Sequence, residues 1–138
     1  MKIQQISIFL ENAAGRLAEV TRELKDGGVN LRAIMIADTA DFGILRVIVD
    51  DPAKAISILE KAQFTTKTTD VLAVTITDKV GSLADVLELF EKNGVNIEYL
   101  YAALNKAGET AVIIFKVEDI ALGLDMVNKH GLYKDAPF

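Results

Sequence analysis

Residues 6–34 recur without a gap 66 positions later, as residues 72–100. An internal repeat constrains the architecture of a chain before any single residue does. Each copy is too long for a solenoid unit and about the right length for a small domain. The sequence therefore predicts two versions of one domain, residues 1–68 and 69–138. The positions that are identical in the two copies are, in first-copy numbers, Gly15, Leu17, Ala18, Val20, Gly28, Val29 and Asn30.

Hydrophobic periodicity gives both copies the same order of elements: strand, helix, strand, strand, helix, strand. In the first copy we expect strands at 6–10, 30–36, 44–49 and 63–68, with helices beginning at residues 17 and 53. In the second we expect strands at 71–77, 96–103 and 110–117, with helices at 82–92 and 119–129. After Gly131 there is room for one short edge strand, so we expect the last strand to be shortened or borrowed.

Two βαββαβ units predict an α+β fold of two ferredoxin-like sandwiches, each an antiparallel four-stranded sheet with both helices on one face. The opposite face also carries apolar residues, so a second copy or another subunit should cover it. This favours paired sheets and a homodimer. The residues expected on that face are Phe9, Ile34, Ile36, Ile44, Ile48, Leu100, Val112 and Ile114.

Composition excludes several classes of function. There is no cysteine, which rules out disulfides, thiol catalysis and cysteine-ligated metals. A net charge of −5 argues against nucleic acid as a partner. No apolar stretch approaches the ~20 residues that span a bilayer, and no secretory signal is evident. We therefore expect a cytoplasmic protein with no membrane partner, no metal and no cofactor.

A matched loop joins the first strand to the first helix of each copy. In each loop a glycine leaves the helix N-terminus open, which suits a carboxylate. Asn12 and Asp78 take the position from which an N-cap side chain accepts a backbone hydrogen bond. The two loops are Asn12-Ala13-Ala14-Gly15-Arg16-Leu17 and Asp78-Lys79-Val80-Gly81-Ser82-Leu83.

Each copy also begins its second strand with asparagine, Asn30-Leu31 and Asn96-Ile97. We expect this residue to lie beside the helix N-terminus. A carboxamide offers a donor and an acceptor, which match the amino and carboxylate groups of an amino acid. Taken singly, these motifs are also ordinary caps and turns. Their recurrence in register in both copies favours a functional role.

The Gly-Val-Asn sequence that follows an x-x-x-Gly-x-Leu loop in a βαββαβ frame resembles the ACT domain. Between Ile6 and about His130 the chain is similar to stand-alone tandem ACT proteins, whose copies bind an amino acid. The segments Ser7–Asn12, Asp41–Arg46 and Asn96–Ala102 look typical of that group. The resemblance implies a ligand at a domain or subunit interface, touching 12–17 with 30–31 and 78–83 with 96–97. The acidic-x-Pro-Gly loop of the family lacks its proline in both copies.

The resemblance implies a non-catalytic protein that binds an amino acid and acts by allosteric regulation on a separate enzyme of amino-acid metabolism. A structural scaffold with vacant sites, serving as a partner-binding subunit of a metabolic enzyme, stays open as an alternative. Acylphosphatase chemistry would need an arginine phosphate cradle, for which Arg16 alone lies in a suitable loop. RNA-binding modules of this topology stack bases on sheet aromatics in a basic setting, whereas this chain is acidic.

Overall fold

The computed structural model describes residues 1–38, 41–104 and 108–132. The chain divides into two compact units. The first unit is Gln4–Thr69, and the second unit combines Met1–Ile3 with Asp70–Phe138. Each unit has two helices packed on strands that pair in antiparallel fashion, so the predicted α+β, ferredoxin-like architecture is confirmed.

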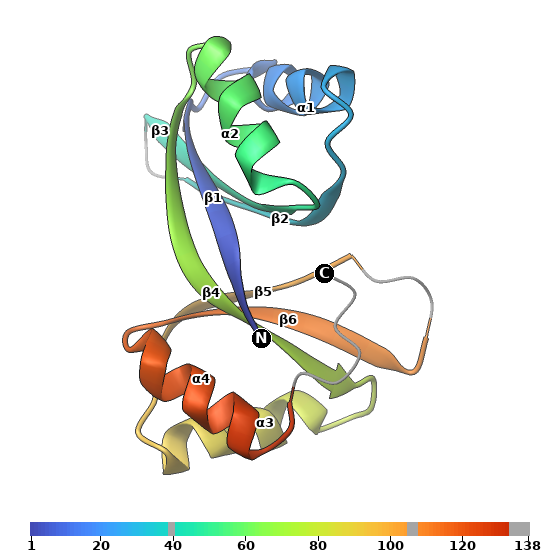
Figure 1. Cartoon of the computed structure of the whole chain (residues 1–138), viewed down its shortest axis with the longest axis vertical. Coiled ribbons are helices and arrows are strands. Elements are labelled where there is room, and N and C mark those ends of the chain that lie inside the picture. Colours follow the sequence, from blue (N-terminus) through green and yellow to red (C-terminus); the bar gives the residue numbers. More distant parts are fainter. Residues whose placement is uncertain (39–40, 105–107, 133–138) are drawn as a thin grey trace. The chain divides into compact units, whose positions relative to one another are not determined.

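In the first unit the strand order is β2-β3-β1-β4, and both helices lie on one face of the strands (Figure 1). The pairing register joins Ile8 to Leu45 and Ile34 to Val47. The elements that build this unit are β1 (Lys2–Glu11), α1 (Arg16–Asp26), β2 (Leu31–Asp38), β3 (Phe42–Val49), α2 (Pro52–Lys61) and the beginning of β4 (Thr65–Thr77).

In the second unit the strand order is β4-β6-β5. Leu72 pairs with Phe115, and Leu100 pairs with Phe115 from the other side. The expected short strand after Gly131 lies largely outside the described residues. Besides the remainder of β4, the elements of this unit are α3 (Ser82–Lys92), β5 (Ile97–Ala102), β6 (Thr110–Val117) and α4 (Ile120–Lys129).

β4 is one continuous strand of 13 residues, where the sequence predicted separate strands at 63–68 and 71–77. Its first part belongs to the first unit and its second part to the second unit. Met1 bonds to the second part: its backbone nitrogen and oxygen exchange hydrogen bonds with Ala73, at 3.0 and 2.8 Å. Further along the same edge, the Thr75 N–H donates to the Leu132 carbonyl at 2.9 Å. Two separate segments therefore bond to this edge of β4.

Each unit has its own apolar core between its helices and its strands. Val20 and Leu24 of α1, and Val86 and Phe90 of α3, occupy matching core positions. Phe90 stacks on Phe115 with ring centroids 4.7 Å apart. None of the helices in the described ranges is long and apolar enough to cross a membrane.

A β-bulge at the start of the second strand of each copy changes which side chains face the helices. The register shifts between Leu31 and Ala33, and again between Ile97 and Tyr99. Because an extra residue moves all following side chains to the opposite face, β2 and β5 reverse the expected pattern. The placement of Phe9, Ile44, Ile48, Val112 and Ile114 away from the helices is confirmed, whereas that of Ile34, Ile36 and Leu100 is wrong.

Candidate functional site

The corner between the first strand and the first helix has the same geometry in both copies. Gly15 and Gly81 take the N-cap position, with φ of 87° and 90°, a left-handed conformation that glycine enters at low cost. A side chain placed at either glycine would meet nothing within 4 Å. The first carbonyl bonds match as well: Glu19 N–H donates to Gly15 and Asp85 N–H donates to Gly81, both at 3.0 Å. Both corners are open to approach.

The predicted side-chain caps at Asn12 and Asp78 are wrong, because neither α1 nor α3 has a side-chain cap. These residues instead continue the strand pairing through their backbone. The Asn12 N–H donates to the Asp41 carbonyl at 3.1 Å, and the Asp78 N–H donates to the Glu109 carbonyl at 2.8 Å.

Because they lack a side-chain cap, α1 and α3 each begin with unpaired backbone N–H donors. The N–H groups of Leu17 and Ala18, and of Leu83 and Ala84, have no acceptor in the part of the chain that the structure describes. Free N–H groups and the positive end of the helix dipole together attract an anion such as a carboxylate.

The two corners differ in their first helical residue. Arg16 places its Nη1 2.6 Å from Glu19 Oε2, and its guanidinium lies 5.1 Å from the centroid of the Phe64 ring. Its buried Nε has no partner among the described residues. The matching residue in the second copy is Ser82, which lines a hollow of about 270 Å³ with Asp85 and Leu132. The first corner is therefore the more cationic of the two at its first helical residue.

The second-strand asparagines lie at the other end of the helix, contrary to expectation. Asn30 follows the C-terminal end of α1, after the turn at Gly28, whereas the corner loop precedes its N-terminal end. The 11 residues of α1 separate the two positions, a rise of about 16 Å. The same holds for Asn96 and α3. Within one unit, the structure does not bring the two predicted halves of the site together.

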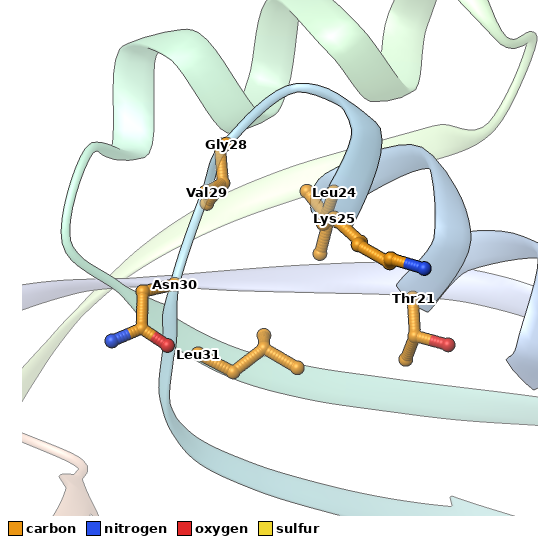
Figure 2. Close-up of a pocket in the computed structure, with 7 residues that line it drawn as sticks. All are labelled: Thr21, Leu24, Lys25, Gly28, Val29, Asn30 and Leu31. Atoms are coloured by element: carbon orange, nitrogen blue, oxygen red, sulfur yellow. The ribbon is translucent and has the colours of Figure 1, made fainter.

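Asn30 and Leu31 line a hollow of about 380 Å³ between α1 and the start of β2. In Figure 2, Leu31 extends toward Thr21, while the carboxamide of Asn30 points away from Thr21 and Lys25. Thr21 and Lys25, which also line this hollow, are not among the residues predicted from the sequence. They lie one helical turn apart on α1, a spacing that also occurs on ordinary solvated faces, so their pattern gave no signal.

The second-copy counterparts are more strongly engaged in local contacts. Asn96 Nδ2 donates to Glu118 Oε2 at 3.2 Å. Ile97 and Leu83 are half-buried and pack against the core of the second unit. In the described ranges no three histidine, cysteine, aspartate or glutamate residues gather in a way that could hold a metal ion.

Fold and corner geometry together define a class: a tandem of ferredoxin-like units, each with an open glycine corner before its first helix. The sequence profile of one family, described as ACT domain pair, matches residues 1–132. The chain belongs to this ACT domain pair family.

Several solved structures share this fold. A protein from Bacteroides thetaiotaomicron is 38% identical, with a TM-score of 0.89, covering 96% of this chain and 90% of that one. The ligand-free regulatory subunit of aspartate kinase from Thermus thermophilus is 17% identical, with a TM-score of 0.66 and 94% coverage of both chains. Aspartokinase III from E. coli, in complex with lysine and aspartate, is 13% identical, with a TM-score of 0.55; the match covers 97% of this chain and 32% of that one. No curated protein matched the chain.

Proposed function

We propose that this protein is a non-catalytic regulatory protein that binds an amino acid. The observation that carries the proposal is the pair of open corners at Gly15 and Gly81, each followed by free N–H groups at a helix N-terminus. A ligand carboxylate would accept hydrogen bonds from these groups. The carboxamide of Asn30 or Asn96 would bind the remaining polar groups of the ligand.

The ligand would have to lie at an interface. Because about 16 Å of helix separates the corner from the second-strand start, one free amino acid does not reach both within a single unit. The corner of one unit and the strand start of another must then supply the two halves. The second contributor is the other unit of the chain or a second chain.

Such a site provides a mechanism for regulation. A ligand that contacts two units would bind most tightly to one of their relative arrangements. Because its affinity differs between arrangements, it shifts the population toward the arrangement that it binds best. The aspartate kinase regulatory subunits of similar fold are consistent with a signal that passes to an enzyme of amino-acid metabolism. We further propose that the protein is cytoplasmic, in keeping with the absence of cysteine from the sequence, and that it forms a homodimer.

One observation favours the scaffold alternative, in which vacant sites leave a subunit that only binds a partner. Four large apolar side chains of the first unit are exposed on β1, β2 and β3: Phe9 and Phe42 on the face away from the helices, and Ile34 and Ile36 on the helix face. Exposed apolar groups of this kind occur at protein interaction surfaces. A scaffold would bind its partner enzyme equally well with and without amino acids.

Calorimetric titration of the folded protein with each of the twenty amino acids tests the proposal. Binding should occur with at least one of them, and Gly15→Asn or Gly81→Asn, whichever corner holds the carboxylate, should weaken it about tenfold, because asparagine accepts the left-handed backbone and fills the corner. Gly131→Asn is the matched control, since Gly131 is also left-handed, at φ 64°, but follows α4. The absence of heat from every amino acid would refute amino-acid sensing and leave the scaffold.

A further inference from the structure

The two copies differ where the second strand begins, although both have asparagine there. In the first unit, Asp50 Oδ1 accepts a hydrogen bond from the backbone N–H of Asn30 at 3.0 Å. The Asp50 N–H in turn donates to the Asn30 carbonyl at 3.1 Å. The carboxamide of Asn30 has no partner among the described residues.

In the second unit the matching acidic residue is Glu118. Its backbone N–H donates to the Asn96 carbonyl at 3.0 Å, as in the first unit. Its carboxylate, however, accepts from the Asn96 side chain at 3.2 Å rather than from the Asn96 backbone. Glutamate has one methylene more than aspartate. The longer side chain thus engages the carboxamide that the shorter one leaves free.

The α1 residues that line the hollow beside Asn30 and Leu31 also differ from their counterparts in the second copy. In the first unit Thr21, Leu24 and Lys25 line it from α1. The residues 66 positions later are Leu87, Phe90 and Glu91. Leu87 and Phe90 pack against the core of the second unit, and Phe90 is 1% exposed. The second copy thus replaces a hydroxyl and an ammonium group with an apolar side chain and a carboxylate.

We propose that only the second-strand start of the first unit, through Asn30, binds the ligand, so the chain holds one amino acid rather than two. This proposal rests on the proposed function. It adds the number of binding sites per chain and the pair of acidic residues, Asp50 and Glu118, that sets this number. Asp50 keeps the Asn30 carboxamide available, and Glu118 occupies that of Asn96. The duplicated motif is therefore functional once per chain.

The test titrates the full chain, with the amino acid that gives heat in the twenty-member series as the probe. Wild-type protein should bind one molecule per chain. Asn30→Ala should weaken binding about tenfold, the loss of roughly one net hydrogen bond. Asp50→Glu, which imitates the second unit, should weaken it several-fold while retaining the negative charge. Asn96→Ala should leave the affinity within twofold of wild type, because its carboxamide is already bonded to Glu118.

Side-chain amide resonances provide a second readout that does not depend on affinity. In ¹⁵N-labelled protein, addition of the same amino acid should shift the Asn30 NH₂ pair and leave the Asn96 pair in place. Folding of each variant is checked by the dispersion of the same spectra. Two molecules bound per chain, or equal losses from Asn30→Ala and Asn96→Ala, would overturn the single site while leaving amino-acid binding intact. Failure of all twenty amino acids to bind would refute both proposals together.

Discussion

Gln63 has a left-handed backbone conformation at a position where the second copy has a glycine. Its φ is 66°, and Gly131, in the matching position after α4, has a φ of 64°. Both residues close a helix end in which the next N–H bonds back into the helix, from Phe64 to Leu59 at 2.9 Å and from Leu132 to Val127 at 3.1 Å. This is the hydrogen-bond pattern of a Schellman motif, which favours glycine at the left-handed position.

We expect Gln63→Gly to stabilise the protein by about 1 kcal/mol, because it removes the steric cost that a side chain bears in the left-handed region. Gly131→Gln should destabilise it by a similar amount. Urea unfolding of both variants, compared at constant m value, measures the two changes. Equal effects of the same sign would contradict this explanation.

At the scale of the elements, the repeat and the hydrophobic periods predicted the order of strands and helices. The helix expected to begin at residue 53 begins at Pro52, and the Asp51 side chain caps it. The faces of β2 and β5 could not be predicted, since a bulge leaves no mark in an apolar run such as Ala33–Ala37, which follows it. The distance between Asn30 and the Gly15 corner was misjudged for another reason. The order along the chain already places Asn30 after the C-terminal end of α1 and Gly15 before its N-terminal end, a constraint that the expectation overlooked.

α4 begins with a side-chain cap and α3 begins without one, and this difference gives a direct prediction. Asp119→Ala should destabilise the protein by about 1 kcal/mol, because the Asp119 carboxylate accepts from the Leu122 N–H at 3.0 Å at the start of α4. Asp78→Ala should change stability by less than about 0.5 kcal/mol, the range usual for surface positions, since α3 has no side-chain cap. Thermal unfolding followed by circular dichroism compares the pair. A larger loss from Asp78→Ala would restore the cap expected from the sequence.

At the scale of the whole molecule, β4 and the N-terminal segment make the two units dependent on each other. β4 runs from the first unit into the second without a break, and Met1–Ile3 belongs to the unit whose remaining residues begin at Asp70. Unfolding of either unit therefore disturbs hydrogen bonds of a strand that both share. This favours one cooperative unfolding transition for the chain.

Deletion of Met1–Ile3 should lower the protection of the Ala73 amide against hydrogen exchange, because that N–H donates to the Met1 carbonyl. Lys2→Ala is the matched control. It removes only an exposed ion pair with Asp70, at 3.5 Å, and such pairs contribute little. Amide exchange measured by NMR should show fast exchange at Ala73 in the deletion variant alone. Unchanged protection there would mean that the segment does not hold this edge of β4.

The shared strand also bears on how such a protein can be dissected. A fragment that starts at Asp70 would lack Met1–Ile3 and leave Ala73, on the edge of β4, without its backbone partner. Bare strand edges template association with other chains, so this half is expected to precipitate when expressed alone. The two copies are similar in sequence, yet they are not interchangeable, because the N-terminal segment belongs to the second unit. Met1–Ile3, at the start of the chain, completes a unit that the second half of the chain forms.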